Sequence, residues 1–574
     1  MNKAQLLQRP KRWDAPFDPS MSDYDVDALL ARPEFSSLDA SRFPAAAPLR
    51  GILKNDCRIV RYDPGDIIVR EGDYGNSAFL VLSGSVQVVL RPGLPQGLLG
   101  RTVEKAKKSA FGALAGMLKR SEISEVRDTS LYAGQASAKA RGRERRSSLL
   151  DAGERAVLFG AGVDPGAKRD RIPPLAAPFK TAVLAPGALF GEIAALGRVQ
   201  RTATVYAETE CRVLEMRWQA LRDVKNRDET WRNRIEQGYR DNQLHNHLVE
   251  HPLLAGLDPK SLQAVAAGTL FETYGSYEWY VEYTSGRTEG PEEPAAAAQG
   301  DYPDGLLLVI GGFGRVSSGL GHGARTLTYL RNGDHFGLDE LYEAWTSGQD
   351  CPYETSLTAL GYLHVLRIPY SVVAEFVFPR IKRPASRLAD AAARPIADDA
   401  LLEWAVEKRY INGSKTMLID LERCVRCDDC VRACADTHGG NPRFLRQGQT
   451  LGKWMVANAC MHCVDPVCMI GCPTGAIHRT MEGGSVVIND LTCIGCGTCA
   501  NSCPYDNIRL VPIRERDGRQ VIDPSSREPI LKATKCDLCH SLPTGPSCER
   551  ACPHGALQRV DMQTLLAKAE AFAG

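Results

Sequence analysis

The chain has 574 residues, of which 44% are hydrophobic and 24% charged, and its formal net charge of +1 argues against a general nucleic-acid binder. This length is enough for several domains, and no apolar run approaches the roughly 20 residues that are needed to span a bilayer. The first residues carry no apolar signal segment and no twin-Arg signal, so we expect a cytoplasmic protein.

The N-terminal half begins with a polar segment and continues as a β-rich region. Residues 1–34 mix Pro, Asp and Arg without periodicity, and we expect an N-terminal tail that docks elsewhere. From Cys57 on, short β-rich runs alternate with the turn signals PG, EGD and SG, as in a small β-barrel or β-roll. We therefore place a first, mainly-β domain at 35–240.

A long insertion at about 91–182 interrupts this β pattern, and it is far longer than an ordinary loop. Its first half, RTVEKAKKSAFGALAGMLKR, has the spacing of a basic amphipathic helix, and its middle carries the charge run KARGRERRSSLL. A solvated, partly disordered insertion is the simpler interpretation. The alternative is a docking element for a partner or for an acidic surface.

The stretch FGEIAALGRVQRTATV, residues 190–205, contains the groups that a cyclic nucleotide requires. A short helix would direct its first N–H groups at the cyclic phosphate, and Gly191 lets the backbone approach closely. Glu192 is placed to accept a hydrogen bond from the ribose 2′-OH. Arg201, nine residues further on, is placed to pair with the phosphate through its planar guanidinium.

This stretch, with Gly84 in the preceding turn LSGSV, resembles the phosphate-binding cassette of the cyclic-nucleotide-binding domain family. The resemblance covers about 51–218 apart from the insertion. It implies that a ligand is held by Gly191, Glu192, the Ala194 N–H, Arg201 and Thr202. Thr202 is compatible with cAMP or cGMP, so the base stays undecided. Domains of this fold also serve as scaffolds without a ligand, whereas the full set of residues here favours binding.

A second β-rich domain is expected at 241–382, because GLLLVIGGFGRVSS parallels AFLVLSGSVQVV and LRNGDHFGLDEL parallels LAPGALFGEIAAL. The preceding segments, 219–251 and HPLLAGLDPKSLQAVAAG, have helical character. The second cradle is degenerate, since Gly337 is separated from Glu340 and the position nine beyond Glu340 is Gln349. A phosphate would lack its Arg there, so we expect this domain to bind no cyclic nucleotide and to be structural.

An Ala- and Pro-rich linker at 383–412 precedes a cysteine-rich domain at 413–574. Only three of the nineteen cysteines, Cys57, Cys211 and Cys351, lie before this domain, and we expect them to be buried small hydrophobes. Clustering of the other sixteen points to metal rather than to disulfides. They form four groups: Cys424, Cys427, Cys430 and Cys434; Cys460, Cys463, Cys468 and Cys472; Cys493, Cys496, Cys499 and Cys503; and Cys536, Cys539, Cys548 and Cys552.

The spacing of these groups is typical of iron–sulfur ligands. Three closely spaced thiolates wrap one face of a cubane, and a fourth, more distant Cys binds the other cluster of a pair. Pro follows the fourth Cys in three of the four groups and turns the chain sharply. Four tetrahedral zinc ions are the alternative. Zinc sites, however, usually pair two CxxC motifs and do not repeat three-plus-one groups that end in Cys-Pro.

Residues 413–565 closely resemble the four-cluster ferredoxin-like subunit of the complex iron–sulfur molybdoenzyme family, above all in CMHCVDPVCMIGCPTGAI and CIGCGTCANSCPYDNIRL. The groups nest in that family, which implies four [4Fe–4S] clusters, at sites that we number I to IV. Site I would use Cys424, Cys427, Cys430 and Cys552; site II, Cys536, Cys539, Cys548 and Cys434; site III, Cys460, Cys463, Cys468 and Cys503; and site IV, Cys493, Cys496, Cys499 and Cys472. The expected fold is two mainly-β cyclic-nucleotide-binding-like domains, of the β-roll or jelly-roll type, followed by an α+β double ferredoxin-like domain.

Cationic residues also lie beside the cysteines, namely Arg426, Arg432, His462 and Lys535. One interpretation is that they offset the negative charge of the clusters and raise their reduction potentials. The other is that they keep the surface soluble, and the sequence does not distinguish the two.

The sequence predicts a non-catalytic subunit, because it has no nucleophile with its base, no P-loop and no dinucleotide fingerprint. We expect it to relay electrons through four clusters in a redox enzyme complex, gated or positioned by the nucleotide-binding-like domains. Its partner would be a molybdenum or tungsten enzyme, a hydrogenase or a flavoprotein, with no nucleic acid and no membrane span. The alternative is a redox- or cyclic-nucleotide-responsive signalling protein.

Overall fold

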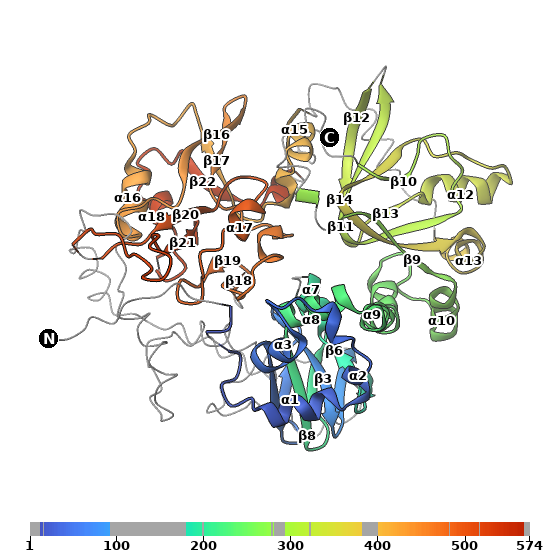
Figure 1. Cartoon of the computed structure of the whole chain (residues 1–574). Coiled ribbons are helices and arrows are strands. Elements are labelled where there is room, and N and C mark those ends of the chain that lie inside the picture. The colour runs from blue at the N-terminus through green and yellow to red at the C-terminus, as the bar shows by residue number, and fades with distance from the viewer. Residues whose placement is uncertain are drawn as a thin grey trace.

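Two β-rich regions and a cysteine-rich region follow one another along the chain in the computed structural model (Figure 1). The structure describes residues 12–14, 16–91, 180–197, 200–276, 279–280, 293–320, 323–381, 400–480, 483–515, 517–542 and 544–566. Nearly all of the insertion predicted at 91–182, including its predicted helix and charge run, lies outside these residues.

The first region is built from two antiparallel four-stranded sheets, in the orders β1-β8-β3-β6 and β2-β7-β4-β5. Their strands are β1 Cys57–Tyr62, β2 Ile67–Val69, β3 Ser77–Ser83, β4 Val86–Arg91, β5 Lys180–Leu184, β6 Leu189–Phe190, β7 Thr204–Ala207 and β8 Cys211–Arg217. Apolar residues of both sheets, such as Phe79 and Val213 of the first and Val86 and Val205 of the second, form one core. Because β4 pairs with β5, the chain leaves and re-enters the β-rich region on neighbouring strands.

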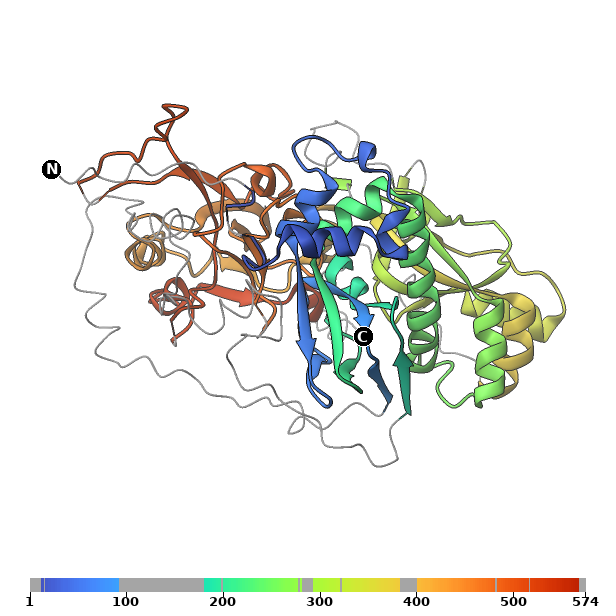
Figure 2. The same cartoon turned by 60° about the horizontal axis from the view of Figure 1, so that its bottom comes forward.

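The predicted N-terminal tail is largely folded onto this first region. It contains α1 Asp23–Leu30 and α2 Pro33–Ser36, which are followed by η1 Ala40–Arg42 and α3 Leu49–Asp56. Ser22 caps α1, and its Val26 and Leu29 are buried. An eight-residue helix is too short for its hydrophobic residues to show a clear helical period in the sequence, and tertiary packing stabilises it. Figure 2 shows these helices, in blue, at one end of the strands.

Three helices lead from the first region to the second, as the sequence predicts. They are α8 Trp218–Arg227, α9 Glu229–Glu250 and α10 Pro259–Gly268. Asp228 separates α8 from α9 and caps α9, because its carboxylate accepts a hydrogen bond from the N–H of Trp231. No helix in the described part of the chain is long and apolar enough to cross a bilayer.

The second region contains one six-stranded antiparallel sheet, in which β10, β14, β11 and β12 are neighbours and β9 and β13 pair at its sides. Its elements are β9 Leu270–Gly275, β10 Ala295–Ala297, β11 Gly305–Leu320, β12 Gly323–Leu330, β13 His335–Phe336, α12 Leu338–Ser347, β14 Ser356–Pro369, α13 Tyr370–Phe376 and η2 Phe378–Arg380. A two-residue strand, a glycine and a helix follow one another here as they do at 189–197 in the first region, which is the repeat that the sequence indicates.

The cysteine-rich region has a sheet in the order β16-β17-β15-β22 and two hairpins, β18–β19 and β20–β21. Its strands are β15 Thr416–Asp420, β16 Leu445–Leu451, β17 Trp454–Asn458, β18 Ile477–Arg479, β19 Val486–Ile488, β20 Arg509–Pro512, β21 Leu531–Thr534 and β22 Leu557–Val560. Its helices are α16 Asp429–Thr437, η5 Val467–Met469, α17 Thr498–Asn501 and α18 Ser547–Arg550.

The end of the predicted linker is also folded. Two helices fall inside the predicted range 383–412, namely α15 Ala400–Glu407 and η4 Tyr410–Asn412. In α15, Trp404 and Val406 are buried. The Ala- and Pro-rich part of that range, 383–399, lies outside the described residues. The apolar face of α15 packs on the cysteine-rich region, which the local composition of the sequence does not reveal.

Candidate functional site

Strand pairing brings together the two ends of the cysteine-rich region and so assembles site I. β15 pairs with β22, Cys424 follows β15, and Cys552 precedes β22. These two cysteines line one cavity of about 340 Å³ together with Cys427 and Cys430. The Sγ of Cys552 also accepts a hydrogen bond from the Ala556 N–H at 3.3 Å.

The four cysteines of site III line a second cavity, of about 350 Å³. These are Cys460, Cys463, Cys468 and Cys503. Cys503 follows α17, and its Sγ accepts a hydrogen bond from the Asn507 N–H at 3.4 Å. In this site too, three cysteines of one sequence group meet a fourth from another group.

The cysteines of sites II and IV also come together. Cys434 lies close enough to Cys536, Cys539 and Cys548 for their charges to affect its pKa. Cys499 likewise lies close enough to Cys472, Cys493 and Cys496 for their charges to affect its pKa. The structure therefore brings together the four members of each of the four predicted sets.

The loops that carry the cysteines bend through left-handed backbone conformations. Arg426 and Asp428 in the first group have φ of 61° and 62°, and His462 in the second has φ of 49°. In the third group, Gly495 and Gly497 adopt left-handed conformations, with φ of 67° and 84°. For residues other than glycine such a conformation costs about 1–3 kcal/mol, and it persists where the surroundings impose it. These bends turn successive thiols towards a common centre.

The chemistry of the sixteen thiols fits iron–sulfur clusters. None of them forms a disulfide. Burial raises the pKa of Cys434 and Cys499 to about 12, and it raises the pKa of Cys463 and Cys468 well above the usual value. These groups are neutral thiols at physiological pH unless a metal cation stabilises the thiolate, which is the form that binds iron.

A buried histidine between the cysteines of site III offers a further donor. The Nδ1 of His462 accepts a hydrogen bond from the Val486 N–H at 3.0 Å, which leaves the proton on Nε2. Burial lowers the pKa of His462 well below its usual value. This Nε2 is buried and has no partner among the described residues. An unsatisfied N–H donor beside a cluster site fits a group that carries sulfide acceptors.

The four cationic neighbours that the sequence singles out differ in environment. Arg426 and Arg432 are exposed, and Arg432 pairs with Asp429 at 2.5 Å. His462 and Lys535 are buried, with 1% and 5% of their surfaces exposed, and His462 is neutral rather than cationic because burial holds its pKa well below the usual value. The two arginines are exposed, as solubility requires, but Arg426 also lines the site I cavity and Arg432 donates to the Cys427 carbonyl oxygen at 2.8 Å. The two buried residues require another explanation.

In the first region, the structure gathers most of the residues of the predicted nucleotide cradle. α7, Glu192–Gly197, follows Gly191, whose φ of 76° allows the backbone to turn directly into the helix. The Arg201 guanidinium donates to the carbonyl oxygens of Gly191 and Ser77 at 2.5 and 2.6 Å. Glu192 and Ala194 are buried beside it, and Thr202 is exposed.

Arg201 is a buried cation without a carboxylate partner. Only 5% of its surface is exposed, and no carboxylate in the described part of the chain forms a salt bridge with it. Burial lowers the pKa of Arg201 to about 10, so the side chain is still charged at neutral pH. The carboxylates of Glu215, Glu192 and Asp73 act on Arg201 from a distance, and a phosphate anion would supply a directly bonded opposite charge at this position.

Glu192 makes the stability of the protein depend on pH. Burial raises its pKa from 4.5 to about 7. Because the unfolded chain loses this proton at lower pH than the folded chain, ionisation of Glu192 destabilises the fold increasingly as the pH rises from about 4.5 to about 7.

We expect Glu192→Gln to raise the free energy of unfolding at about pH 8 by up to roughly 3 kcal/mol, and to raise it little at about pH 5. Thermal unfolding of the full-length wild type and variant at both pH values measures this. Glu210→Gln is the control, because Glu210 is exposed and pairs with Arg61 at the surface. A gain that is equal at both pH values would contradict the assignment.

The second cradle lacks a comparable cation at the predicted position. Gly337, with φ of 85°, precedes α12, and Glu340 is buried in the first turn of that helix. Gln349, which stands where Arg would be needed, is exposed beyond the end of α12. The expectation that this region binds no cyclic nucleotide stays a prediction.

Comparison with known proteins relates the cysteine-rich region and the first β-rich region to known families. Family models described as "4Fe-4S dicluster domain" match residues 452–516 and 492–556. The electron transport protein HydN of Escherichia coli is 32% identical over 164 residues, which are 26% of this chain and 91% of HydN. The chain belongs to the 4Fe-4S dicluster family of electron transport proteins. This agrees with the resemblance seen in the sequence of the cysteine-rich region.

Another relative of this dicluster protein is the B subunit of an anaerobic dimethyl sulfoxide reductase from Haemophilus influenzae, which is 33% identical over 170 residues, 26% of this chain and 75% of that protein. The model "Cyclic nucleotide-binding domain" matches residues 179–228, which include the cradle. Among solved structures, the regulatory domain of Toxoplasma gondii PKA with cAMP covers 60% of this chain and 86% of its own, at 15% identity. Its TM-score is 0.19, which is too low to support a structural argument.

The cradle region of this dicluster protein packs directly on site IV. Ala195 of α7 and Trp218 of α8 belong to the same hydrophobic core as Cys472 and Cys499. Polar contacts cross the same boundary. The Gln219 amide oxygen accepts from the Gly475 N–H at 2.7 Å, in the orientation that satisfies its neighbours, and Arg222 donates to the Ile470 carbonyl.

A second contact joins the cradle of the dicluster protein to site III. Tyr74 forms a β-bridge with Gln200, the residue before Arg201. The Arg479 guanidinium lies 5.0 Å from the centre of the Tyr74 ring and donates to the carbonyl oxygen of Cys463 at 2.7 Å. A short series of contacts thus runs from the cradle arginine to a cysteine of site III.

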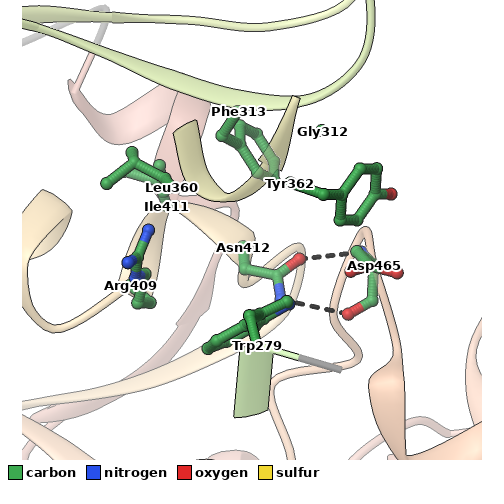
Figure 3. Close-up of a pocket in the computed structure, with 9 residues that line it drawn as sticks. All are labelled: Trp279, Gly312, Phe313, Leu360, Tyr362, Arg409, Ile411, Asn412 and Asp465. Atoms are coloured by element: carbon green, nitrogen blue, oxygen red, sulfur yellow. Dashed lines mark hydrogen bonds between the residues drawn. The ribbon is translucent and has the colours of Figure 1, made fainter. Parts of the chain in front are cut away.

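The second β-rich region supports site III from another side, at a small pocket (Figure 3). Trp279, Phe313 and Tyr362 of that region line the pocket opposite Asn412 and Asp465. The Asn412 side chain accepts from the Asp465 N–H at 2.7 Å and donates to its carbonyl oxygen at 3.1 Å. Asp465 lies between two site III cysteines, so these bonds hold the ligand loop in place.

Several residues beside the clusters were not predicted from the sequence. Arg479, Lys532 and Arg559 lie on short strands of the dicluster region beside the cysteines, and each bonds to a cysteine carbonyl or sulfur. Their signal is a charged residue within a short strand, as in LKAT and LQRV. Asn412 carries no comparable signal, because its partner is distant in sequence.

Proposed function

We propose that the protein is the electron-transfer subunit of a cytoplasmic redox enzyme complex and relays electrons through four [4Fe–4S] clusters held at sites I to IV. The main support is that sixteen cysteines from four sequence groups gather into four sets of four, in a region whose relatives are electron transport proteins. The proposed domains are 35–240 and 241–382, both cyclic-nucleotide-binding-like, and 413–574 with the clusters.

The partner that we propose is a catalytic oxidoreductase subunit. Relatives of the cysteine-rich region include hydrogenase-4 component A of Escherichia coli and the beta subunit of an NADH-dependent phenylglyoxylate dehydrogenase of Aromatoleum evansii. Each cluster, when bound, accepts and releases one electron at a time. The protein's own residues hold the clusters, exclude water from the buried sulfurs and donate N–H groups to them.

Anaerobically purified protein is expected to contain about sixteen iron and about sixteen sulfide ions per chain. Reduction should produce EPR signals of several interacting [4Fe–4S]⁺ clusters. Iron and sulfide analysis, with EPR before and after reduction, measures both quantities. Stoichiometric zinc in place of iron would refute the proposed function.

We also propose that the first β-rich domain binds cAMP or cGMP and that this binding gates electron transfer. The proposal is supported by the family match at 179–228, by the buried charge of Arg201 and by the contacts of the cradle with sites III and IV. The second domain would be structural. Its Trp279, Phe313 and Tyr362 line a pocket with Asn412 and Asp465, which hold the loop of site III.

A redox- or cyclic-nucleotide-responsive signalling protein is the second candidate. The packing of a nucleotide cradle on a cluster site is the observation that favours it. Purification from the native cell distinguishes the two candidates. A catalytic oxidoreductase that co-purifies in a fixed ratio supports electron transfer, and a protein that carries clusters but has no such partner supports signalling.

A further inference from the structure

Lys535 is a buried cation at the boundary between sites II and III. It follows β21, and only 5% of its surface is exposed. Its Nζ donates to the Sγ of Cys460, a site III cysteine, at 3.2 Å. The same Nζ donates to the carbonyl oxygen of Cys536, a site II cysteine, at 2.9 Å, and to the Val486 carbonyl.

Arg559 on β22 makes the reciprocal pair of contacts. Its Nη2 donates to the Sγ of Cys536 at 3.0 Å, and its Nη1 donates to the carbonyl oxygen of Cys460 at 3.1 Å. Each cation therefore bonds to the sulfur of one site and to the backbone of the other. Two positive charges connect the same two cysteines, one from each site.

The anionic partners of these two cations are the cysteine sulfurs. In the described part of the chain, neither Lys535 nor Arg559 forms a salt bridge with a carboxylate. Lys535 is buried and Arg559 is half-buried, so the low local dielectric strengthens the effect on neighbouring negative charge most for Lys535.

Reduction increases the negative charge that these cations face. A [4Fe–4S]²⁺ core with four thiolates carries a net charge of about −2, and one added electron takes it to about −3. A fixed positive charge hydrogen-bonded to a ligand sulfur stabilises the reduced form more than the oxidised form, and so raises the reduction potential.

We propose that Lys535 and Arg559 together form a cationic clamp that raises the potentials of the clusters at sites II and III above those at sites I and IV. This inference rests on the proposed function, because it requires clusters at these sites. The clamp makes the middle of the relay the place where an electron is held. Electrons that arrive from either end then collect at this junction before they leave.

A purely structural role is the alternative, because Lys535 also ties the Val486 and Cys536 backbones together. Removal of such a tie would change cluster retention or stability, but it would not shift two potentials selectively. Lys532 provides a matched control. It is a buried lysine of the same strand segment, and it donates to the carbonyl oxygens of Asp490 and Cys493 at 2.7 and 2.6 Å.

The test is an EPR-monitored redox titration of the full-length, cluster-loaded protein. In Lys535→Met, we expect the ratio of reduced to oxidised cluster to fall at least tenfold at two sites, which is a shift of about −59 mV for a one-electron couple. Lys535→Arg keeps the positive charge and should restore most of the wild-type reduction potential at both sites. Lys532→Met should leave these two clusters unchanged, and Arg559→Gln should shift the same two as Lys535→Met.

The outcomes separate this inference from the proposed function. Wild-type protein that holds no iron refutes the function. Full iron content with unchanged potentials in both Lys535→Met and Arg559→Gln refutes the clamp alone. An equal shift of all four clusters also refutes it, because that is a general effect of altered charge or folding. If Lys535→Met does not fold, the titration of Arg559→Gln decides.

Discussion

Cys424→Ser and Cys552→Ser are expected to remove the same cluster, although the two cysteines lie near opposite ends of the cysteine-rich region. Each variant should bind about twelve instead of about sixteen iron ions and lose the same EPR signal. The reason is that β15 pairs with β22 and brings both thiols to one cavity with Cys427 and Cys430. Loss of either ligand leaves the cubane with three thiolates in an exposed position, which favours its release.

Variants of neighbouring cysteines make this experiment decisive. Cys548→Ser should remove a different signal, because Cys548 lies with Cys434, Cys536 and Cys539. Cys351→Ser is the control for thiol loss, since Cys351 lies between α12 and β14 of the second β-rich region and should leave the iron content unchanged. Loss of one common signal in Cys552→Ser and Cys548→Ser would show that each sequence group holds its own cluster, and would overturn the nested assignment.

The cysteine sets illustrate which part of the site the sequence determines locally. The three closely spaced cysteines of a group, such as Cys493, Cys496 and Cys499, share one loop, so their spacing alone indicates a common metal. The fourth ligand comes from a distant group through a tertiary contact. Spacing leaves its partner open, and only the resemblance to a known family suggested the nested arrangement that the strand pairing of β15 and β22 makes possible.

Elements that depend on tertiary packing were harder to predict. The helices α1 and α15 fall in segments that the sequence marks as a tail and a linker, because each is only eight residues long. Neither would be stable alone, since isolated helices of that length are marginal in water. Burial of Val26 and Leu29 in α1 and of Trp404 in α15 stabilises them.

The role of a charged residue is equally hard to predict from the sequence. Arg432 and Lys535 both lie close to cysteines in the sequence, and the sequence does not separate an exposed arginine from a buried lysine. The structure pairs Arg432 with Asp429 at the surface and places the Lys535 ammonium against the sulfur of Cys460. Burial follows from long-range packing, so local pattern indicates that a cation is near a cluster site but not what it does.

The contact between the cradle and the clusters gives the two halves of the chain a physical connection. The sequence does not indicate that Trp218 shares a hydrophobic core with Cys472 and Cys499. A shared core transmits small displacements because protein interiors are closely packed. On the gating proposal, a ligand that moves α7 or Arg201 would change the surroundings of sites III and IV.

Arg201→Ala is expected to abolish binding of cAMP or cGMP while the cluster-containing region keeps its iron. The side chain is the buried cation of the cradle, and loss of its charged hydrogen bonds to a phosphate costs about 3 kcal/mol or more, which is over a hundredfold in Kd. Isothermal titration calorimetry of the full chain with each nucleotide measures this. Wild-type protein that binds neither nucleotide would refute the cradle's proposed role and leave the electron-transfer proposal intact.

Binding of a nucleotide does not by itself show that it affects the clusters, so the gating proposal needs a second measurement. In the wild type, the bound nucleotide should change the EPR signal or potential of the site III cluster, through the contacts from Gln200 to Tyr74 and from Arg479 to Cys463. Tyr74→Leu is the matched variant, since it keeps Arg201 and removes the aromatic ring under Arg479. It should bind nucleotide as the wild type does and lose the effect on site III. A full effect in Tyr74→Leu would show that the signal travels instead through the core shared by α7, α8 and site IV.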